Sequence, residues 1–124
     1  MAKIFRAKWW PGIIRTVRLL LSFRDVAVPA WYSIHNIVLQ MLLRQYGLSA
    51  VMKPQGLPLE DNEVRLVVLP PPDMLTALQA GSIAGYIVAE PYNSAAELNQ
   101  SGKLLRLTGD IWKDHACCVV FMHE

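Results

Sequence analysis

Hydrophobic and polar positions follow two different periods along most of this chain. Short apolar runs closed by proline or glycine are typical of buried strands, whereas apolar residues three and four positions apart are typical of helices that cover a sheet. The apolar runs predict strands over residues 25–29, 63–69, 83–89, 104–107 and 117–122. The helical spacing predicts helices that begin at Ser33, at Asp73 and at Asn93 or Ser94, and that end near Gly47, Gly81 and Gly102. Residues 49–62 are rich in proline and glycine and are predicted to form a loop.

This order of elements predicts the class of fold. Strands that alternate with helices are joined by crossover connections, which make the strands parallel and place helices on both faces of one sheet. The sequence therefore predicts an α/β fold with a mainly parallel sheet, in which the last apolar run is the candidate for an antiparallel strand. A chain of 124 residues with 53% hydrophobic and 18% charged residues fits one packed domain rather than a disordered segment. We assign that domain to residues 25–124.

Residues 1–24 form a leader that differs from the rest in charge. The leader has six basic and no acidic residues, a charge of +6, while residues 25–124 have six basic and ten acidic residues, a charge of −4. One face of a basic amphipathic helix would carry Ile14, Val17, Leu20 and Leu21. This helix would lie on a membrane, on a missing part of the protein or on the domain's own core. Arg15 and Arg18 interrupt the apolar run, so the leader is not a clear signal peptide, and its longest uncharged piece is too short to span a bilayer. The body lacks basic residues interleaved with aromatic ones, so nucleic acid is not an expected partner.

The familiar signatures of catalysis are missing from the sequence. It has no G-x-S-x-G turn, no glycine-rich phosphate loop and no H-E-x-x-H helix, so we do not expect an enzyme. The three histidines are far apart in the sequence, and Cys117 and Cys118 are adjacent, so neither set has the spacing of a metal site. We expect no metal and no cofactor. We interpret the two cysteines as small core residues of the last strand, one on each face, and leave their redox state open.

Polar and aromatic side chains follow the predicted strands at the points where they end, and open α/β sheets bind ligands just beyond the carboxyl ends of their strands. After the first strand, Ser33 and His35 lie where a helix N-terminus leaves unpaired N–H groups for a small anion, and Trp31 can form a flat wall beside them. Glu90 follows another strand and is either exposed at the cleft or paired. We therefore predict that Trp31, Ser33, His35 and Glu90 bind a ligand. The plainer alternative is that Ser33 only caps the helix, His35 bonds locally and Trp31 packs beneath the helix.

Several segments, taken together, resemble a known family. The segments Val26–Pro29, Ser33–Asn36, Val64–Met74, Leu78–Asn93 and Gly109–Trp112 are similar, in order and spacing, to the solute-binding proteins of ABC importers. The most similar branch is the one that binds nitrate, bicarbonate, sulfonates and taurine. The resemblance implies the second lobe of a type II periplasmic binding protein, which captures a small anionic solute without catalysis.

The resemblance also implies roles, partners and a location. The family's cleft histidine falls on His35, and a position that tends to be lysine in nitrate binders and glutamate in bicarbonate binders falls on Glu90, which favours bicarbonate over nitrate. The implied partners are a small-molecule solute and the permease and ATPase subunits of an ABC importer, at a periplasmic or membrane-associated location. Because two lobes of such a protein close on the solute, we expect this chain to be a fragment, whose open face would favour self-association. The alternative function is a sensory or scaffold lobe that docks on a membrane or a partner protein through the basic leader.

Overall fold

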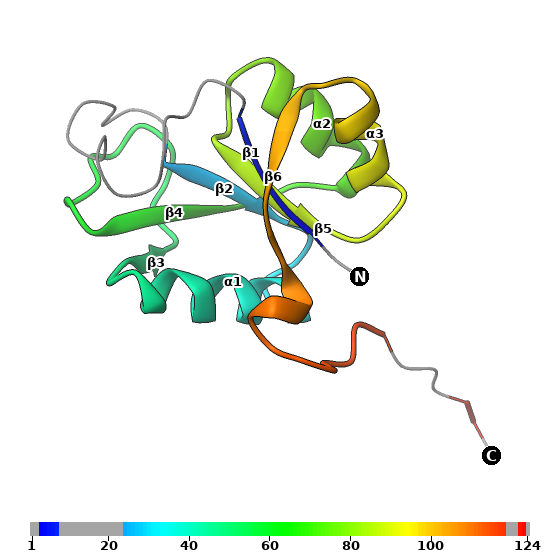
Figure 1. Ribbon diagram of the computed structural model, residues 1–124. Coiled ribbons are helices and arrows are strands. Elements are labelled where there is room, and N and C mark those ends of the chain that lie inside the picture. Colours follow the sequence, from blue (N-terminus) through cyan, green and yellow to red (C-terminus); the bar gives the residue numbers. More distant parts are fainter. Residues whose placement is uncertain (1–2, 8–23, 119–121, 124) are drawn as a thin grey trace.

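The computed structural model describes residues 3–7, 24–118 and 122–123 and shows one sheet with helices on both faces (Figure 1). Its six strands lie in the order β3-β4-β2-β5-β1-β6. Along the chain the elements are β1 (Lys3–Ala7), β2 (Asp25–Val28), α1 (Ile34–Gln45), β3 (Ser49–Val51), β4 (Glu63–Val68), α2 (Pro71–Gln79), β5 (Gly85–Val88), α3 (Tyr92–Leu98), β6 (Gly102–Leu107) and the 3₁₀ helix η1 (Thr108–Asp110). The predicted α/β fold with a mainly parallel sheet is confirmed.

The centre of the sheet is parallel. β2 pairs in parallel with β4 on one side and with β5 on the other, and β3 extends the sheet beyond β4. Every residue of β2 and of β5 is buried, which is why both segments are almost uninterrupted apolar runs in the sequence. Because parallel strands point the same way, β4, β2 and β5 all end at one edge of the sheet, with the end of β2 between the other two (Figure 1).

Two apolar clusters cover the two faces of the sheet. α1 packs on one face, where Leu39 meets Val26 and Val28 of β2. α2 and α3 cover the opposite face, where Met74 belongs to the same cluster as Ala27 (Figure 1). Successive residues of β2 thus alternate between the two clusters, as the two-residue period of a strand requires. This packing places α1 on one face of the sheet, and α2 and α3 on the other, next to the edge where β4, β2 and β5 end.

β1 is the one antiparallel strand among those the structure describes. It lies between β5 and β6, and Ile4 is opposite Ile87 of β5 and Arg106 of β6 (Figure 1). These residues fall within the range that the sequence assigns to the leader, so part of the leader belongs to the sheet of the lobe. The amphipathic helix predicted between Ile14 and Leu21 lies outside the described residues.

Three local predictions differ from the structure. β3 lies inside the segment that the sequence predicts as a loop, because three residues at a sheet edge make too short a pattern to recognise. α2 begins at Pro71 rather than after a cap at Asp73, since the missing N–H of proline costs nothing in a first helical turn. Cys117 and Cys118 are exposed, have free thiols and lie outside any strand, so their interpretation as core residues of a strand is wrong. An apolar run forms a strand only where the edge of a sheet is available to pair with it. Residues 119–121 of this predicted strand lie outside the described part of the chain.

A buried ion pair ties β2 to β4 at the edge opposite the strand ends described above. The Arg65 guanidinium lies 2.8 Å from the Asp25 carboxylate, and the two side chains are 8% and 9% exposed. Arg65 also donates a hydrogen bond to the carbonyl of Leu57. The neighbouring Arg24 donates to the carbonyl of Glu60 at 2.6 Å. Both arginines therefore fasten the loop before β4 to the start of β2.

We predict that Asp25→Asn lowers the free energy of unfolding by about 3 kcal/mol, because the buried Arg65 charge loses its partner. Urea unfolding of the whole chain at neutral pH measures this change. Lys53→Ala is the control, since its ion pair with Glu63 is partly exposed and should contribute less than about 1 kcal/mol. A loss no larger for Asp25→Asn than for the control would contradict the role given to the buried pair.

We also predict that deleting residues 1–7 releases β6. Among the described strands β6 pairs only with β1, so its N–H groups lose their partners when β1 is removed. Hydrogen exchange should become fast over Lys103–Leu107 and remain slow in β2 and β4, which keep each other as partners. Slow exchange in β6 of the shortened chain would show that the strand does not depend on β1.

Candidate functional site

Three turns meet at the edge where β4, β2 and β5 end (Figure 1). They span residues 29–33, 69–70 and 89–91. The N–H of Leu69 donates to the carbonyl of Val28 at 3.1 Å, which ties the first two turns together. The turn after β2 lies in the middle because β2 lies between β4 and β5. Sequence order alone does not reveal this arrangement, but strand pairing makes it unavoidable.

The turn after β2 is held in shape by Ser33 and Asn36. Ser33 is the N-cap of α1: its hydroxyl accepts a bond from the N–H of Asn36 at 3.2 Å and donates to the carbonyl of Ala30 at 2.8 Å. The buried Asn36 amide donates to the carbonyl of Trp31 at 2.8 Å, and its oxygen accepts a bond from Gln40 at 3.0 Å. Asn36 is a positioning residue that the sequence reasoning missed. The available signal was a polar residue on the core-facing side of a helix.

His35 lies in the first turn of α1. Both of its ring nitrogens are buried, and neither has a hydrogen-bond partner within the described structure. Burial lowers the pKa of the His35 imidazole below its ordinary value of 6.5, and the charge of His115 lowers it further. A neutral imidazole has one N–H donor and one acceptor nitrogen. His35 therefore has a donor and an acceptor that remain to be satisfied, and the predicted local hydrogen bond is not found.

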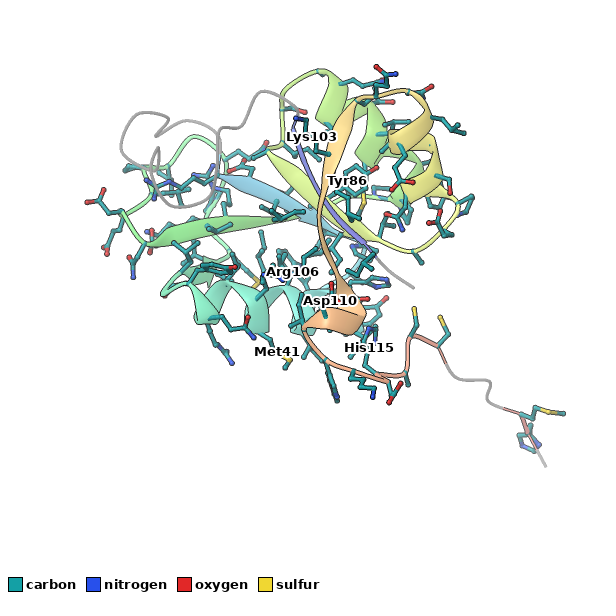
Figure 2. The ribbon with its side chains drawn as sticks, viewed as in Figure 1. Met41, Tyr86, Lys103, Arg106, Asp110 and His115 are labelled. Carbon is teal, nitrogen blue, oxygen red and sulfur yellow. The ribbon has the colours of Figure 1, made fainter. Side chains whose placement is uncertain are left out.

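Residues 108–118, which we call the C-terminal arm, run beside the end of α1 that carries His35 (Figures 1 and 2). The arm includes η1, and Figure 2 shows His115 just beyond it. The ring of Trp112 is 6.2 Å from that of His115 between centroids, with the planes at 45°. The fold thus brings His35 near His115, although most of the domain's residues lie between them in the sequence. No motif in the sequence indicated this pairing.

Two tryptophan side chains near this end of α1 are a little less than half exposed. Trp31 is 43% exposed and Trp112 is 44% exposed. More than half of the Trp31 side chain is therefore covered by the domain, so both the role of an apolar wall and packing against the helix stay open for this residue. A half-exposed indole beside a buried imidazole is suited to form the apolar side of a ligand site.

Glu90 lies in the turn after β5. One of its carboxylate oxygens accepts bonds from the N–H and the hydroxyl of Ser94, at 3.0 and 2.7 Å, so Glu90 is both exposed and paired. The neighbouring Tyr86 hydroxyl donates to the carbonyl of Tyr92 at 3.2 Å. Burial raises the pKa of Tyr86 to about 12, and the Glu90 charge adds to this effect. Glu90 is therefore held by the first turn of α3.

The four predicted site residues all belong to turns or helix starts at the same edge of the sheet. Trp31, Ser33 and His35 belong to the turn and helix on the α1 face, whereas Glu90 leads into α3 on the opposite face.

Within residues 3–7, 24–118 and 122–123, no three histidine, cysteine or acidic side chains gather in a way that could hold a metal ion. In the same part of the chain, every helix is too short or too polar to cross a bilayer.

Comparison with known proteins agrees with this architecture. The ligand-binding component of an ABC-type import system from Staphylococcus aureus, solved with zinc bound, superposes with a TM-score of 0.68 at 26% identity, covering 94% of this chain and 36% of that one. The nitrate import ATP-binding protein NrtC of Synechocystis is 34% identical over 112 residues, which are 90% of this chain and 16% of the relative. The bicarbonate transport ATP-binding protein CmpC of the same organism is 30% identical over 92 residues, 74% of this chain and 12% of the relative. This chain thus spans less than a fifth of the length of these two relatives.

The fold is that of one lobe of an ABC-import solute-binding protein. The model of the NMT1-like family matches residues 22–124, and the chain belongs to that family. The resemblance inferred from the sequence motifs is confirmed.

We predict that acidification destabilises the fold through His35. Because its pKa is lowered in the folded state, the unfolded chain binds the proton more readily, and the free energy of unfolding should decrease as the pH falls below about 6.5. His35→Gln removes this titration, so its stability should decrease less than that of the wild type between about pH 7.5 and about pH 5.5. Urea unfolding at the two values measures the difference. His123→Gln, at an exposed position, should behave as the wild type; equal losses in all three proteins would contradict the prediction.

Proposed function

We propose that this chain is a solute-binding lobe that holds a small anion at the edge where β4, β2 and β5 end, and that it serves an ABC-type importer without catalysing a reaction. The observation that carries the proposal is the state of His35. Two buried ring nitrogens without partners are costly unless a ligand satisfies them. Bicarbonate, nitrate and sulfonates are the candidate solutes.

The start of α1 supplies further attraction for an anion. The N–H groups of a first helical turn point out of the helix end and carry a partial positive charge. The Ser33 hydroxyl occupies only the N–H of Asn36, which leaves the earlier N–H groups of the turn for another acceptor. Trp31 would form the apolar wall of the same site. Ser33 as the cap, His35 as the hydrogen-bonding group and Trp31 as the apolar wall could therefore act together on one anion.

Glu90 bears on the choice of solute. A carboxylate repels nitrate, which has no proton to donate, whereas bicarbonate has a hydroxyl that can donate a hydrogen bond to it. The names of the two relatives mention nitrate and bicarbonate, so these names do not decide between the solutes. The glutamate at this position favours bicarbonate.

The remaining parts of the proposal concern the whole protein. Its partners would be the permease and ATPase subunits of an importer, and its location periplasmic or membrane-associated. The edge residues would face a second lobe, or another copy of the chain where no lobe covers them. The alternative of a sensory or scaffold lobe docked through the leader is disfavoured, because residues 3–7 of that leader are committed to the sheet.

We predict that the 124-residue chain binds bicarbonate or nitrate, added as the sodium salt, weakly but saturably. An affinity near 1 mM corresponds to about −4 kcal/mol and is readily followed by NMR. Amide shifts should move at residues 30–36, and His35→Ala should weaken binding about tenfold, the loss expected for a hydrogen bond to a charged group. Sodium chloride at equal ionic strength is the control, and His123→Gln should bind as the wild type. Unchanged affinity in His35→Ala would remove His35 from the site.

We predict that Glu90→Gln alters selectivity rather than binding in general. The amide oxygen of glutamine can still accept the bonds from Ser94, so the turn should persist. Removal of the Glu90 charge relieves the repulsion of both anions equally, but only bicarbonate loses a hydrogen bond to the carboxylate. Such a bond to a charged group is worth about 1.5 kcal/mol, so the affinity for nitrate relative to bicarbonate should rise roughly tenfold. The same NMR titrations measure the ratio. A ratio that does not change would place Glu90 outside the reach of the solute.

A further inference from the structure

The C-terminal arm is anchored beside the candidate site. Ile111 packs against the apolar cluster that joins α1 to the sheet. The N–H groups of Ile111 and Trp112 both donate to the carbonyl of Thr108, at 3.1 and 3.0 Å, and Thr108 is fully buried. The start of the arm is therefore part of the folded domain, and the position of His115 follows from it.

His115 is the ionisable group of the arm that acts on His35. Figure 2 shows His115 beside the end of α1 that carries His35, and the charge of His115 lowers the pKa of His35. Trp112 lies against the His115 ring, 6.2 Å away between centroids, and limits where that ring can turn. The unpartnered nitrogens of His35 therefore lie near a second imidazole that is only partly buried.

The other charged groups around the pair do not compete for this role. Asp110, Lys113 and Asp114 of the arm are exposed. In α1, the only ionisable residue besides His35 is Arg44, which lies in the last turn. Glu90, on the neighbouring turn, accepts two bonds from Ser94. Within the described residues, α1 therefore places no acidic residue near the two imidazoles.

We propose that His115 is a second solute-binding residue, so that an oxyanion at the start of α1 accepts hydrogen bonds from both imidazoles. A planar or tetrahedral oxyanion has several oxygen acceptors that point in different directions, whereas one neutral imidazole offers a single donor. A second imidazole beside the anion adds a donor that His35 cannot supply alone. This inference rests on the proposed function and extends its site from the turn to the C-terminal arm.

NMR of the whole chain tests the inference with sodium bicarbonate and sodium nitrate as probes. The variants are His115→Gln, His35→Ala and, as a matched histidine control, His123→Gln. Two quantities are measured for each: the dissociation constant of the anion from amide and imidazole shifts, and the pKa of His35 without added anion. The second quantity reports on the neighbouring imidazole without requiring any solute.

We expect His115→Gln to weaken anion binding about tenfold and to raise the pKa of His35, while His123→Gln changes neither. In the wild type, the His115 ring resonances should shift together with those of His35 as the anion is added. If the wild type binds but His115→Gln binds equally well, the inference is overturned and the proposed function stands. If the wild type shows no saturable shift at His35 with either anion, the proposed function itself fails, and the inference fails with it.

Discussion

The parallel pairing of β2 with β4 and β5 is the constraint on which the rest of the structure depends. Val26 is opposite Leu66 of β4 and Gly85 of β5. A shift of β2 by one residue would move Val26 and Val28 out of the α1 cluster and into the cluster of α2 and α3, so packing on both faces allows only one register. Once this register is set, the turns after the three strands lie side by side. The edge that carries the candidate site is therefore a consequence of the core.

The sequence predicted the elements whose evidence is local. β2, β4, β5 and their helices were recognisable because a strand buried on both faces is apolar along its length, and because Ser33 and Gly47 mark the two ends of α1. β1 was missed because Lys3 and Arg6 leave it only a very short apolar run and its partners lie about 80 and 100 residues further along the chain. The cysteines were misplaced for a related reason: an apolar run shows that a strand is feasible, but it does not show that a sheet edge is available for it.

The site was predicted in part. His35 and Glu90 could be placed at one edge of the sheet because both follow parallel strands. His115 could not, since its position depends on how β6 pairs with β1 and on how η1 then turns the chain toward α1. Asn36 was overlooked because its function is indirect: it holds the Trp31 carbonyl and so shapes the turn from within. Residues that act through the fold leave little trace in a single sequence.

The buried histidine links stability to function. A donor or acceptor buried without a partner costs about 1–3 kcal/mol, a cost that the apolar packing of α1 must offset. Buried polar groups in a folded protein normally have hydrogen-bond partners, and exceptions are expected at functional sites. The same desolvation that lowers the pKa of His35 also strengthens any hydrogen bond it makes to an anion, because water does not compete there. In the proposed site, affinity for a small solute would thus arise from an arrangement that the empty fold does not favour.

A crystal structure of the whole chain grown with sodium bicarbonate, and a second grown with sodium nitrate, would test the central claim most directly. The account predicts an oxyanion within hydrogen-bonding distance of a ring nitrogen of His35, at the start of α1. A structure in which that place holds no anion in either crystal, and in which both His35 nitrogens bond to groups of the protein instead, would contradict it.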